Sequence, residues 1–358
     1  MQPVPGSSTV ASDAAWGMEK AWGNVPIRTL PIRLSLGRHF VADHAGTSDG
    51  VWLVGVDQPD AFPATHEASY AVLYSVGKRE IRRMAELDSP ASQMLWASAD
   101  DRWVVWSEAS DTPSFFDWRI FAYDLRTGSV RQIARAVRAD GHAVPGPYPN
   151  PSVSHGIAAW SQAMTDDVAP GHLSDIAVRE CDLSSGSVRT LATSAGWPVI
   201  SWPWTAWLVS TGNGTGYVQV SNRQTGESRR IAATPPMLAL GGATLAYPDA
   251  QSLSVWLLDD LATGTAPRMI ARGTDVTDHL EWVTLNARIV AWSQSLATQV
   301  YDRAEQHLVT LPVTRGRSAV YVCGPLVVWE DNDASTPAYR GWADRELIID
   351  SSRLPVHP

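Results

Sequence analysis

The sequence has few of the features that assign a chemistry directly. Its 358 residues include only two cysteines, Cys181 and Cys323, and no CxxC or His/Cys spacing suggests zinc. We expect these two residues to be buried structural thiols, not a disulfide. The sequence also has no GxSxG, HExxH or phosphate-binding loop motif. We therefore expect no metal and no cofactor, and the motifs leave open whether the chain is an enzyme.

Lysine is nearly absent, because Lys20 and Lys78 are the only two among 28 basic residues. The net charge is −9, the isoelectric point is near 5.4, and no run of basic residues occurs. An acidic surface repels phosphate backbones, so we expect no nucleic-acid partner. The composition gives no reason to expect anything other than a monomer.

Long apolar runs are also missing, so the sequence predicts no membrane span. The first residues, MQPVPGSSTVASDAAWG, contain no apolar signal segment but are rich in Pro, Ser and Gly. We expect residues 1–25 to form a flexible tether, in which only Ala14 to Trp22 has a helical pattern. Such a tether remains when a secretion signal is removed, which favours a secreted or cell-envelope protein. A cytoplasmic protein with a loose N-terminus looks the same.

The sequence does contain repeats. One short phrase recurs as IRRMAE (81–86), VRQIAR (130–135), VRTLAT (188–193), SRRIAA (228–233), PRMIAR (267–272) and, more weakly, HLVTLP (307–312). Most copies follow a turn of the type Asp-Leu-x-x-Gly, as at Asp124–Gly128 and Asp182–Gly186. Upstream of each turn lies an apolar run that ends in an aromatic residue, such as Trp106, Trp160 or Trp292.

Each repeat holds short strands separated by turns and spans about 40 to 55 residues, the period of a four-stranded propeller blade. Because one blade cannot bury both of its faces, the recurring Trp and Ile/Leu side chains are expected to pack between blades. The fold class is therefore all-β, a seven-bladed β-propeller over residues 26–358.

The two ends of the chain complement each other. The last repeat stops after ELIID (346–350) without an outer strand, whereas IRTLPI (27–32) is a copy of the outer-strand phrase with no preceding blade. An unpaired strand at either end leaves a raw sheet edge. We therefore predict that residues 27–32 complete the C-terminal blade.

The motifs WVVWSE, RIFAYDLRTG and VRQIAR resemble the WD40-like repeat of TolB-type propellers, and the resemblance covers residues 27 to 350. It implies the propeller fold, on a scaffold often found in secreted or envelope proteins. It implies no specific function, because this fold serves binding proteins and enzymes alike.

The connections between the second and third strands differ in length. They are long in blades seven, one, two and three, for example from Trp106 to Asp124, and short in blades four to six, as from Trp292 to Asp302. Long connections clustered over neighbouring blades are typical of a functional site. From these connections and the insertion at 138–150 we select eleven candidate ligand-binding residues: Asp60, His66, Phe115, Phe116, Trp118, His142, Tyr148, His172, Tyr339, Arg340 and Trp342.

Two functions remain open for this surface. The first, which we favour, is a binding propeller that recognises a protein or glycan with exposed aromatic and acidic side chains. The second is a propeller enzyme, such as a polysaccharide lyase, a glycosidase or a small-molecule cyclase or hydrolase, with a pocket at the mouth of the channel. A displaced pKa in such a pocket would favour the enzyme.

Overall fold

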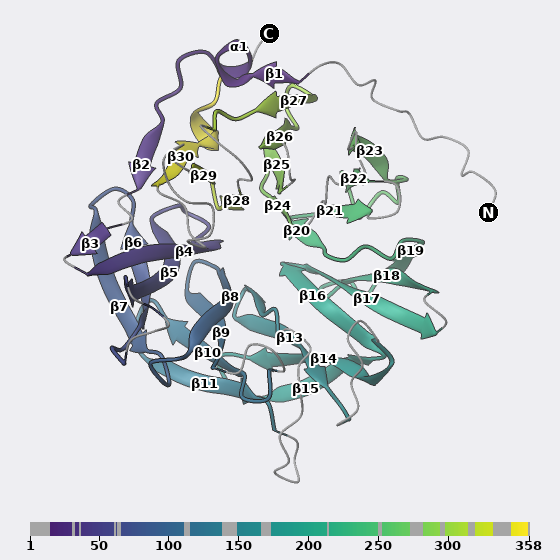
Figure 1. Ribbon diagram of the computed structural model, residues 1–358. Coiled ribbons are helices and arrows are strands. Elements are labelled where there is room, and N and C mark those ends of the chain that lie inside the picture. The colour runs from purple at the N-terminus through teal and green to yellow at the C-terminus, as the bar shows by residue number, and fades with distance from the viewer. Residues whose placement is uncertain are drawn as a thin grey trace. The chain divides into compact units, whose positions relative to one another are not determined.

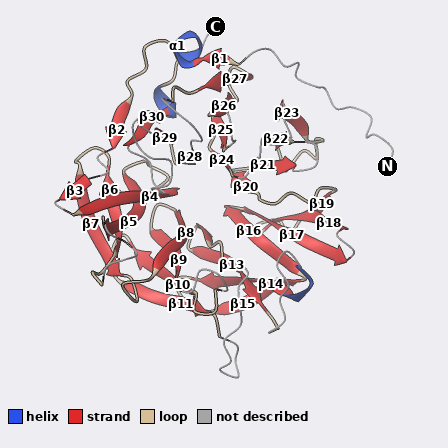
Figure 2. Cartoon of the chain, viewed as in Figure 1, coloured by secondary structure: helices blue, strands red, loops and turns tan. Residues whose placement is uncertain are grey.

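The structure, a computed structural model, describes residues 15–356 except 31–32, 36, 61, 63–65, 111–114, 138–148, 166–172, 213–214, 250–252, 273–281, 294–297, 314–318 and 332–344. The regular secondary structure of the described residues is almost entirely strand (Figure 2). The strands form seven sheets, which are the blades of a seven-bladed β-propeller. The chain divides into two compact units, residues 32–234 and residues 1–31 with 235–358. Each unit is described by itself.

The first unit holds blades one to four. Blade one consists of β4 (Arg38–Gly46), β5 (Trp52–Pro59), β6 (Tyr70–Ser75) and β7 (Glu80–Glu86), with β3 (Arg33–Ser35) paired to β4. Blade two consists of β8 (Gln93–Ala99), β9 (Trp103–Ala109), β10 (Arg119–Asp124) and β11 (Val130–Arg135). Blade three consists of β12 (Ser152–Ser154), β13 (Ile157–Ala163), β14 (Ile176–Asp182) and β15 (Val188–Thr193), with the short helix η1 (Leu173–Asp175). Blade four consists of β16 (Ala195–Ser201), β17 (Trp204–Gly212), β18 (Thr215–Asn222) and β19 (Ser228–Ile231).

The second unit holds blades five to seven. Blade five consists of β20 (Ala239–Gly241), β21 (Thr244–Asp249), β22 (Ser254–Leu258) and β23 (Arg268–Arg272). Blade six consists of β24 (Val283–Leu285), β25 (Ile289–Trp292), β26 (Gln299–Asp302) and β27 (His307–Thr310). Blade seven consists of β28 (Val320–Cys323), β29 (Leu326–Asp331), β30 (Arg345–Asp350) and β2 (Arg28–Leu30), followed by η2 (Ser351–Arg353). Figure 1 labels these strands in chain order.

The repeated phrase of the sequence is the fourth strand of its blade, as in β7, β11, β15, β19, β23 and β27. The turn before it is tight because Gly128 adopts φ 74° and donates its N–H to the Asp124 carbonyl at 2.8 Å. A positive φ is nearly free for glycine and strained for other residues. The Asp124 carboxylate accepts the N–H of Arg126 at 2.9 Å and so fixes the turn.

The recurring aromatic residues of the second strands are buried, as predicted. Trp106 packs in a core formed by blades one and two, and Trp160 in a core formed by blades two and three. Trp292 and Trp329 are fully buried in the other unit. Burying aromatic side chains of this size between sheets is a large source of stability.

The N-terminal strand completes the last blade, which confirms the prediction. β2 pairs antiparallel with β30, with Arg28 opposite Ile348. The expected flexible tether does not hold for Trp16–Trp22, however. β1 (Trp16–Gly17) runs parallel to β27, and α1 (Met18–Trp22), which falls inside the predicted helical stretch, buries Ala21 and Trp22. The Trp22 indole donates to Asp302 Oδ2 at 2.8 Å, so this segment belongs to the packed core.

The cysteines behave as expected, since Cys181 and Cys323 are both buried and free. In the described part of the chain, no helix combines the length and apolar character that crossing a bilayer requires.

Candidate functional site

The connections between second and third strands differ in length as the sequence predicted. β9 ends at Ala109 and β10 begins at Arg119, and β5 and β6 are separated in the same way, from Pro59 to Tyr70. In blade four, by contrast, β17 ends at Gly212 and β18 begins at Thr215. We call the ends of blades one and two that carry long connections the loop edge. Its residues are Arg38, His39, Asp57–Asp60, Tyr70, Arg83, Asp88, Glu108–Ser110 and Phe115–Arg119.

In blade one, the loop edge is built around the buried carboxylate of Asp57. Arg38 Nε donates to Asp57 Oδ1 at 2.6 Å, and Arg83 Nη2 donates to Asp57 Oδ2 at 3.1 Å. The Arg83 guanidinium lies 3.9 Å from the centre of the Tyr70 ring, and that of Arg38 lies 5.3 Å from it. Charge-assisted hydrogen bonds and cation–π contacts together make this end of the blade rigid.

The predicted residue Asp60 belongs to a second polar group beside this one. Its Oδ1 lies 3.0 Å from Nδ1 of His39, a side chain that is only 3% exposed. The Gln58 amide lies 3.0 Å from the other ring nitrogen, Nε2. Since the amide nitrogen can only donate, Nε2 accepts and Nδ1 carries the proton that it donates to Asp60. Asp60 itself remains half exposed to solvent.

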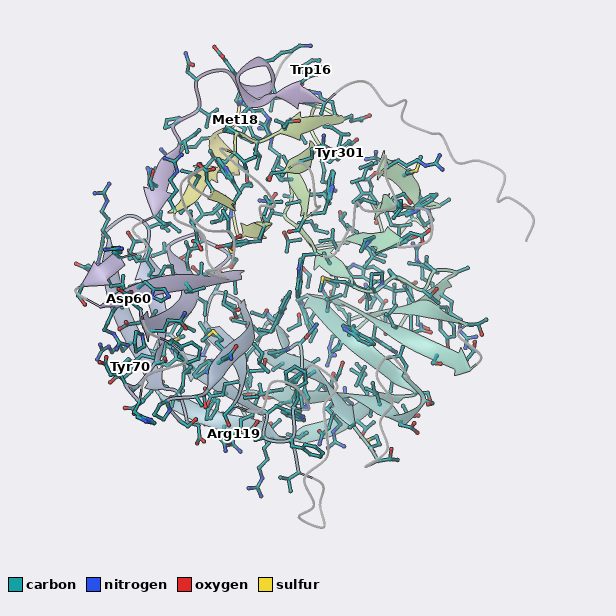
Figure 3. The ribbon with its side chains drawn as sticks, viewed as in Figure 1. Trp16, Met18, Asp60, Tyr70, Arg119 and Tyr301 are labelled. Carbon is teal, nitrogen blue, oxygen red and sulfur yellow. The ribbon has the colours of Figure 1, made fainter. Side chains whose placement is uncertain are left out.

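In blade two, the loop edge contains an acid that forms no ion pair with any described residue, Glu108. Burial raises its pKa to about 7, although the N–H of Asp88 at 3.1 Å and the Trp106 indole at 3.3 Å oppose the shift. Arg119 lies directly opposite Glu108 on β10 but pairs with Asp88. The Asp88 carboxylate adds to the rise and the charge of Arg119 reduces it. Figure 3 shows Asp60, Tyr70 and Arg119 on the sheets of blades one and two.

The three aromatic residues predicted in the connection of blade two have different environments. Phe116 is 47% exposed, as expected, and Phe115 is half-buried with φ 52°. The prediction that Trp118 is exposed is wrong. Trp118 is fully buried in the core between blades two and three, because it directly precedes β10 and its large ring fills the space beside Ile120.

The remaining predicted residues are only partly placed. His66 is exposed at the loop edge of blade one. His142, Tyr148, His172, Tyr339, Arg340 and Trp342 lie outside the described residues. Sequence reasoning missed Glu108 and Arg119, although both flank a long connection, because they read as ordinary strand ends. It also missed Arg38 and His39, whose first-strand position gives no periodic signal.

Two further observations bear on chemistry. Asp43, in the first strand of blade one, has its pKa raised to about 8 by burial, and its Oδ2 has no hydrogen-bond partner among the described residues. It lies where β4 bulges between Ala42 and Ala45. Within the described ranges, no three His, Cys, Asp or Glu side chains come close enough together to hold a metal ion.

Comparison with known proteins shows the fold but no family. No protein-family model matches the sequence. No curated protein matches it either.

Solved structures do match. A prolyl endopeptidase is 9% identical with a TM-score of 0.61, and the match covers 88% of this chain and 49% of that one. The β-propeller domain of the Trilobed protease from Pyrococcus furiosus is 11% identical with a TM-score of 0.52, covering 83% and 90%. TolB from Acinetobacter baumannii is 14% identical with a TM-score of 0.44, covering 77% and 66%.

These likenesses concern the propeller alone, since all identities are low. The chain spans about half the length of the prolyl endopeptidase that it matches. The Pyrococcus propeller is described as having an open velcro topology, whereas β2 of this chain pairs with β30 in the last blade. The chain is thus a β-propeller similar to those of a prolyl endopeptidase and of the Trilobed protease.

Proposed function

We propose that this chain is a binding propeller that recognises a protein ligand through its loop edge. The observation that carries the proposal is Phe116, a large apolar side chain that is 47% exposed in the long connection between β9 and β10. Exposed aromatic residues on connections held by rigid sheets are typical contact points in protein interfaces.

The surroundings of Phe116 favour a protein over a glycan. Charged groups of both signs lie at the same edge, with Asp88 and Asp60 about half exposed and Arg119 paired to Asp88. An apolar contact point within a charged rim is the usual pattern of a protein interface. The other predicted residues, among them His66, His142, Tyr148, His172, Tyr339, Arg340 and Trp342, remain part of this proposal.

Site-specific photo-crosslinking tests the proposal directly. A benzoyl-phenylalanine at position 116 is compared with one at position 130, because Val130 is similarly exposed but lies at the opposite end of blade two. We expect the probe at 116 to crosslink a defined protein from extracts of the source cells. The probe at 130 should not capture it, and Phe116→Asp should weaken its binding at least tenfold.

Immobilised glycans serve as the second arm of the experiment. Binding of the chain to a glycan that Phe116→Asp abolishes and Val130→Asp preserves would show that the ligand is a carbohydrate and overturn the choice of a protein. Equal crosslinking at 116 and 130, or equal binding of both variants, would overturn the loop edge as the binding site.

At the loop edge, the catalytic alternative has one observation in its favour, the pKa of Glu108, which burial raises to about 7. A general acid must reach its substrate, however, and Glu108 is 2% exposed with both carboxylate oxygens accepting hydrogen bonds from the protein. This enclosure favours binding over catalysis at the loop edge.

The proposal includes a location outside the cytoplasm and a monomeric state. The support is the frequent use of this repeat scaffold in secreted and cell-envelope proteins. Fractionation of cells that express the full gene tests the location, and light scattering of the purified chain tests the mass. A cytoplasmic pool alone, or a dimer at micromolar concentration, would contradict it.

A further inference from the structure

A groove separate from the loop edge lies between blades three and four. Its volume is about 190 Å³, and it is open to solvent on one side. One wall comes from β15 of blade three, with Arg189 and Leu191. The other comes from blade four, with Thr205 and Trp207 on β17 and with Asn222 and Arg223 at the turn that follows β18. This turn lies at the end of the blade opposite to the connection between β17 and β18.

Two polar groups on the blade-four wall lack partners. Thr205 Oγ1 and Trp207 Nε1 are shielded from solvent and have no hydrogen-bond partner among the described residues. The two residues are 1% and 7% exposed and lie two positions apart on β17, so both point to the same face of the sheet. Buried polar groups without partners are rare and require an explanation. Two of them in one groove suggest a site for a ligand.

The charges of the groove favour an anion. Glu180, which is buried, accepts hydrogen bonds from Arg223 Nη1 at 2.7 Å and Nη2 at 3.1 Å, and from Arg189 Nε at 2.5 Å. Burial works against ionisation of Glu180, but these two arginines outweigh it and lower its pKa. Because two guanidinium groups face one carboxylate, these three side chains together carry a net positive charge.

The hydrogen-bonding groups point to the same ligand chemistry. The side-chain oxygen Oδ1 of Asn222 accepts the N–H groups of Gln224 at 2.9 Å and Thr225 at 3.1 Å. The side-chain nitrogen Nδ2 of Asn222 is therefore the atom that can donate to a ligand. The Trp207 indole N–H and the guanidinium of Arg189 can only donate. A ligand in this groove must therefore supply oxygen acceptors. The Trp207 ring, packed against Leu191, adds an apolar surface.

Arg189 is the movable part of the wall. Its side chain is 68% exposed and Glu180 holds it through Nε, whereas the Arg223 side chain is 14% exposed and binds Glu180 through two nitrogens. Because Thr205 Oγ1 and Trp207 Nε1 are shielded, a ligand reaches them only when the wall shifts.

We propose that the groove between blades three and four binds a small ligand carrying an oxyanion, a carboxylate or a phosphate, beside hydroxyl groups. The guanidinium of Arg189 pairs with the oxyanion, and Trp207 Nε1 and Thr205 Oγ1 bind its oxygens.

Calorimetric titration with glucuronate, glucose 6-phosphate and glucose tests the proposal and separates the two sources of charge. We expect at least one of the two anions to bind at least tenfold more tightly than neutral glucose. Arg189→Gln should weaken that binding at least tenfold, and Thr205→Val, which keeps the shape of the side chain, about threefold. Arg179→Gln is the matched control, because Arg179 lies on the same blade, pairs with Thr190 and is not part of the groove.

A second measurement, by NMR, reports directly on a side chain of the groove and does not depend on the heat of binding. The Trp207 indole N–H resonance, identified by its loss in Trp207→Phe, should shift when the tighter anion is added and stay in place with glucose. Absence of binding by both anions at tens of millimolar, equal binding by Arg189→Gln and Arg179→Gln, or a Trp207 resonance that does not move would each overturn the proposal.

Discussion

Each end of blade two buries one acid, and the pKa values of these two acids are shifted in opposite directions. We call the end of blade two that carries the turn between β10 and β11 the turn end. Asp124, at the turn end, is 3% exposed, and Glu108, at the loop edge, is 2% exposed. Burial raises both pKa values in itself, but Arg102 at 2.9 Å and the N–H of Arg126 overcome it at Asp124, whose pKa falls below its usual value. At Glu108 the arginine opposite turns to Asp88, and the pKa rises to about 7.

The difference separates scaffold from site. The pairing at the turn end recurs in blade six, where Asp302 is paired with Arg288 at 3.0 Å just as Asp124 is paired with Arg102 at 2.9 Å. A buried acid that gains a hydrogen-bonded arginine is retained at little cost, whereas one that does not must become neutral. The loop edge thus departs from the repeat at the place where the connections lengthen, which fits a surface selected for contact and not for stability.

The largest effect should come from removing Trp118, the buried core of the loop edge. Trp118→Ala leaves a cavity between blades two and three, and large aromatic-to-alanine changes cost about 3–5 kcal/mol. Urea unfolding should show this loss of free energy of unfolding. Phe116→Ala, two residues away and exposed, should change it by about 0.5 kcal/mol or less. Equal losses would show that the two aromatic residues are not distinguished by burial.

The pH dependence of the free energy of unfolding tests whether the pKa of Glu108 is raised in the folded chain. Glutamate ionises near 4.5 in the unfolded chain and Glu108 near 7 in the folded one, so folding is penalised as pH rises from 4.5 to 7. The loss is up to about 3 kcal/mol above pH 7. Glu108→Gln, which resembles the protonated acid, should remove this loss and match the wild type at pH 4.5. Urea unfolding from pH 4.5 to 8 measures it, and parallel curves would refute the displaced pKa.

Features that recur along the chain could be predicted from the sequence, whereas contacts made only once could not. The repeated fourth strands, the turn glycines and Trp106 or Trp160 recur at fixed offsets, so blade number and the pairing of β2 with β30 were predictable. The exposure of Phe116 was predicted too. The burial of Trp118 was not, because a residue beside a strand end has no period. Nor does the sequence show that Arg119 forms an ion pair with Asp88, so that Glu108 has no ion pair with a described residue. This arrangement depends on how β9, β10 and the segment after β7 meet in space.

At the turn end, removing the charge of Asp124 should be costly at neutral pH. Asp124→Asn keeps one oxygen for the turn but loses the ion pair with Arg102. Because the Arg102 side chain is 42% exposed, solvent weakens the pair, and we expect a loss of about 2 kcal/mol. The pKa of Asp124 is lowered from 3.8 in the folded chain, so the loss should shrink as the pH falls below 3.8 and vanish only below the folded-state pKa. Urea unfolding followed from pH 7 down to the lowest pH at which the chain stays folded separates the charge from the turn.

The smallest expected effect tests why the pKa of Glu108 is raised. Asp88→Asn removes a neighbouring negative charge and releases Arg119, which lies directly opposite Glu108. Both changes favour the ionised form of Glu108, so its pKa should fall towards the ordinary range. The net change in free energy of unfolding at pH 7 should be only about 1 kcal/mol, because the variant also loses a surface ion pair. The chemical shift of the Glu108 carboxyl carbon, followed with pH, measures the change. If the midpoint stays where it is in the wild type, burial alone sets the pKa, and the diversion of Arg119 to Asp88 has no part in distinguishing the loop edge from the turn end.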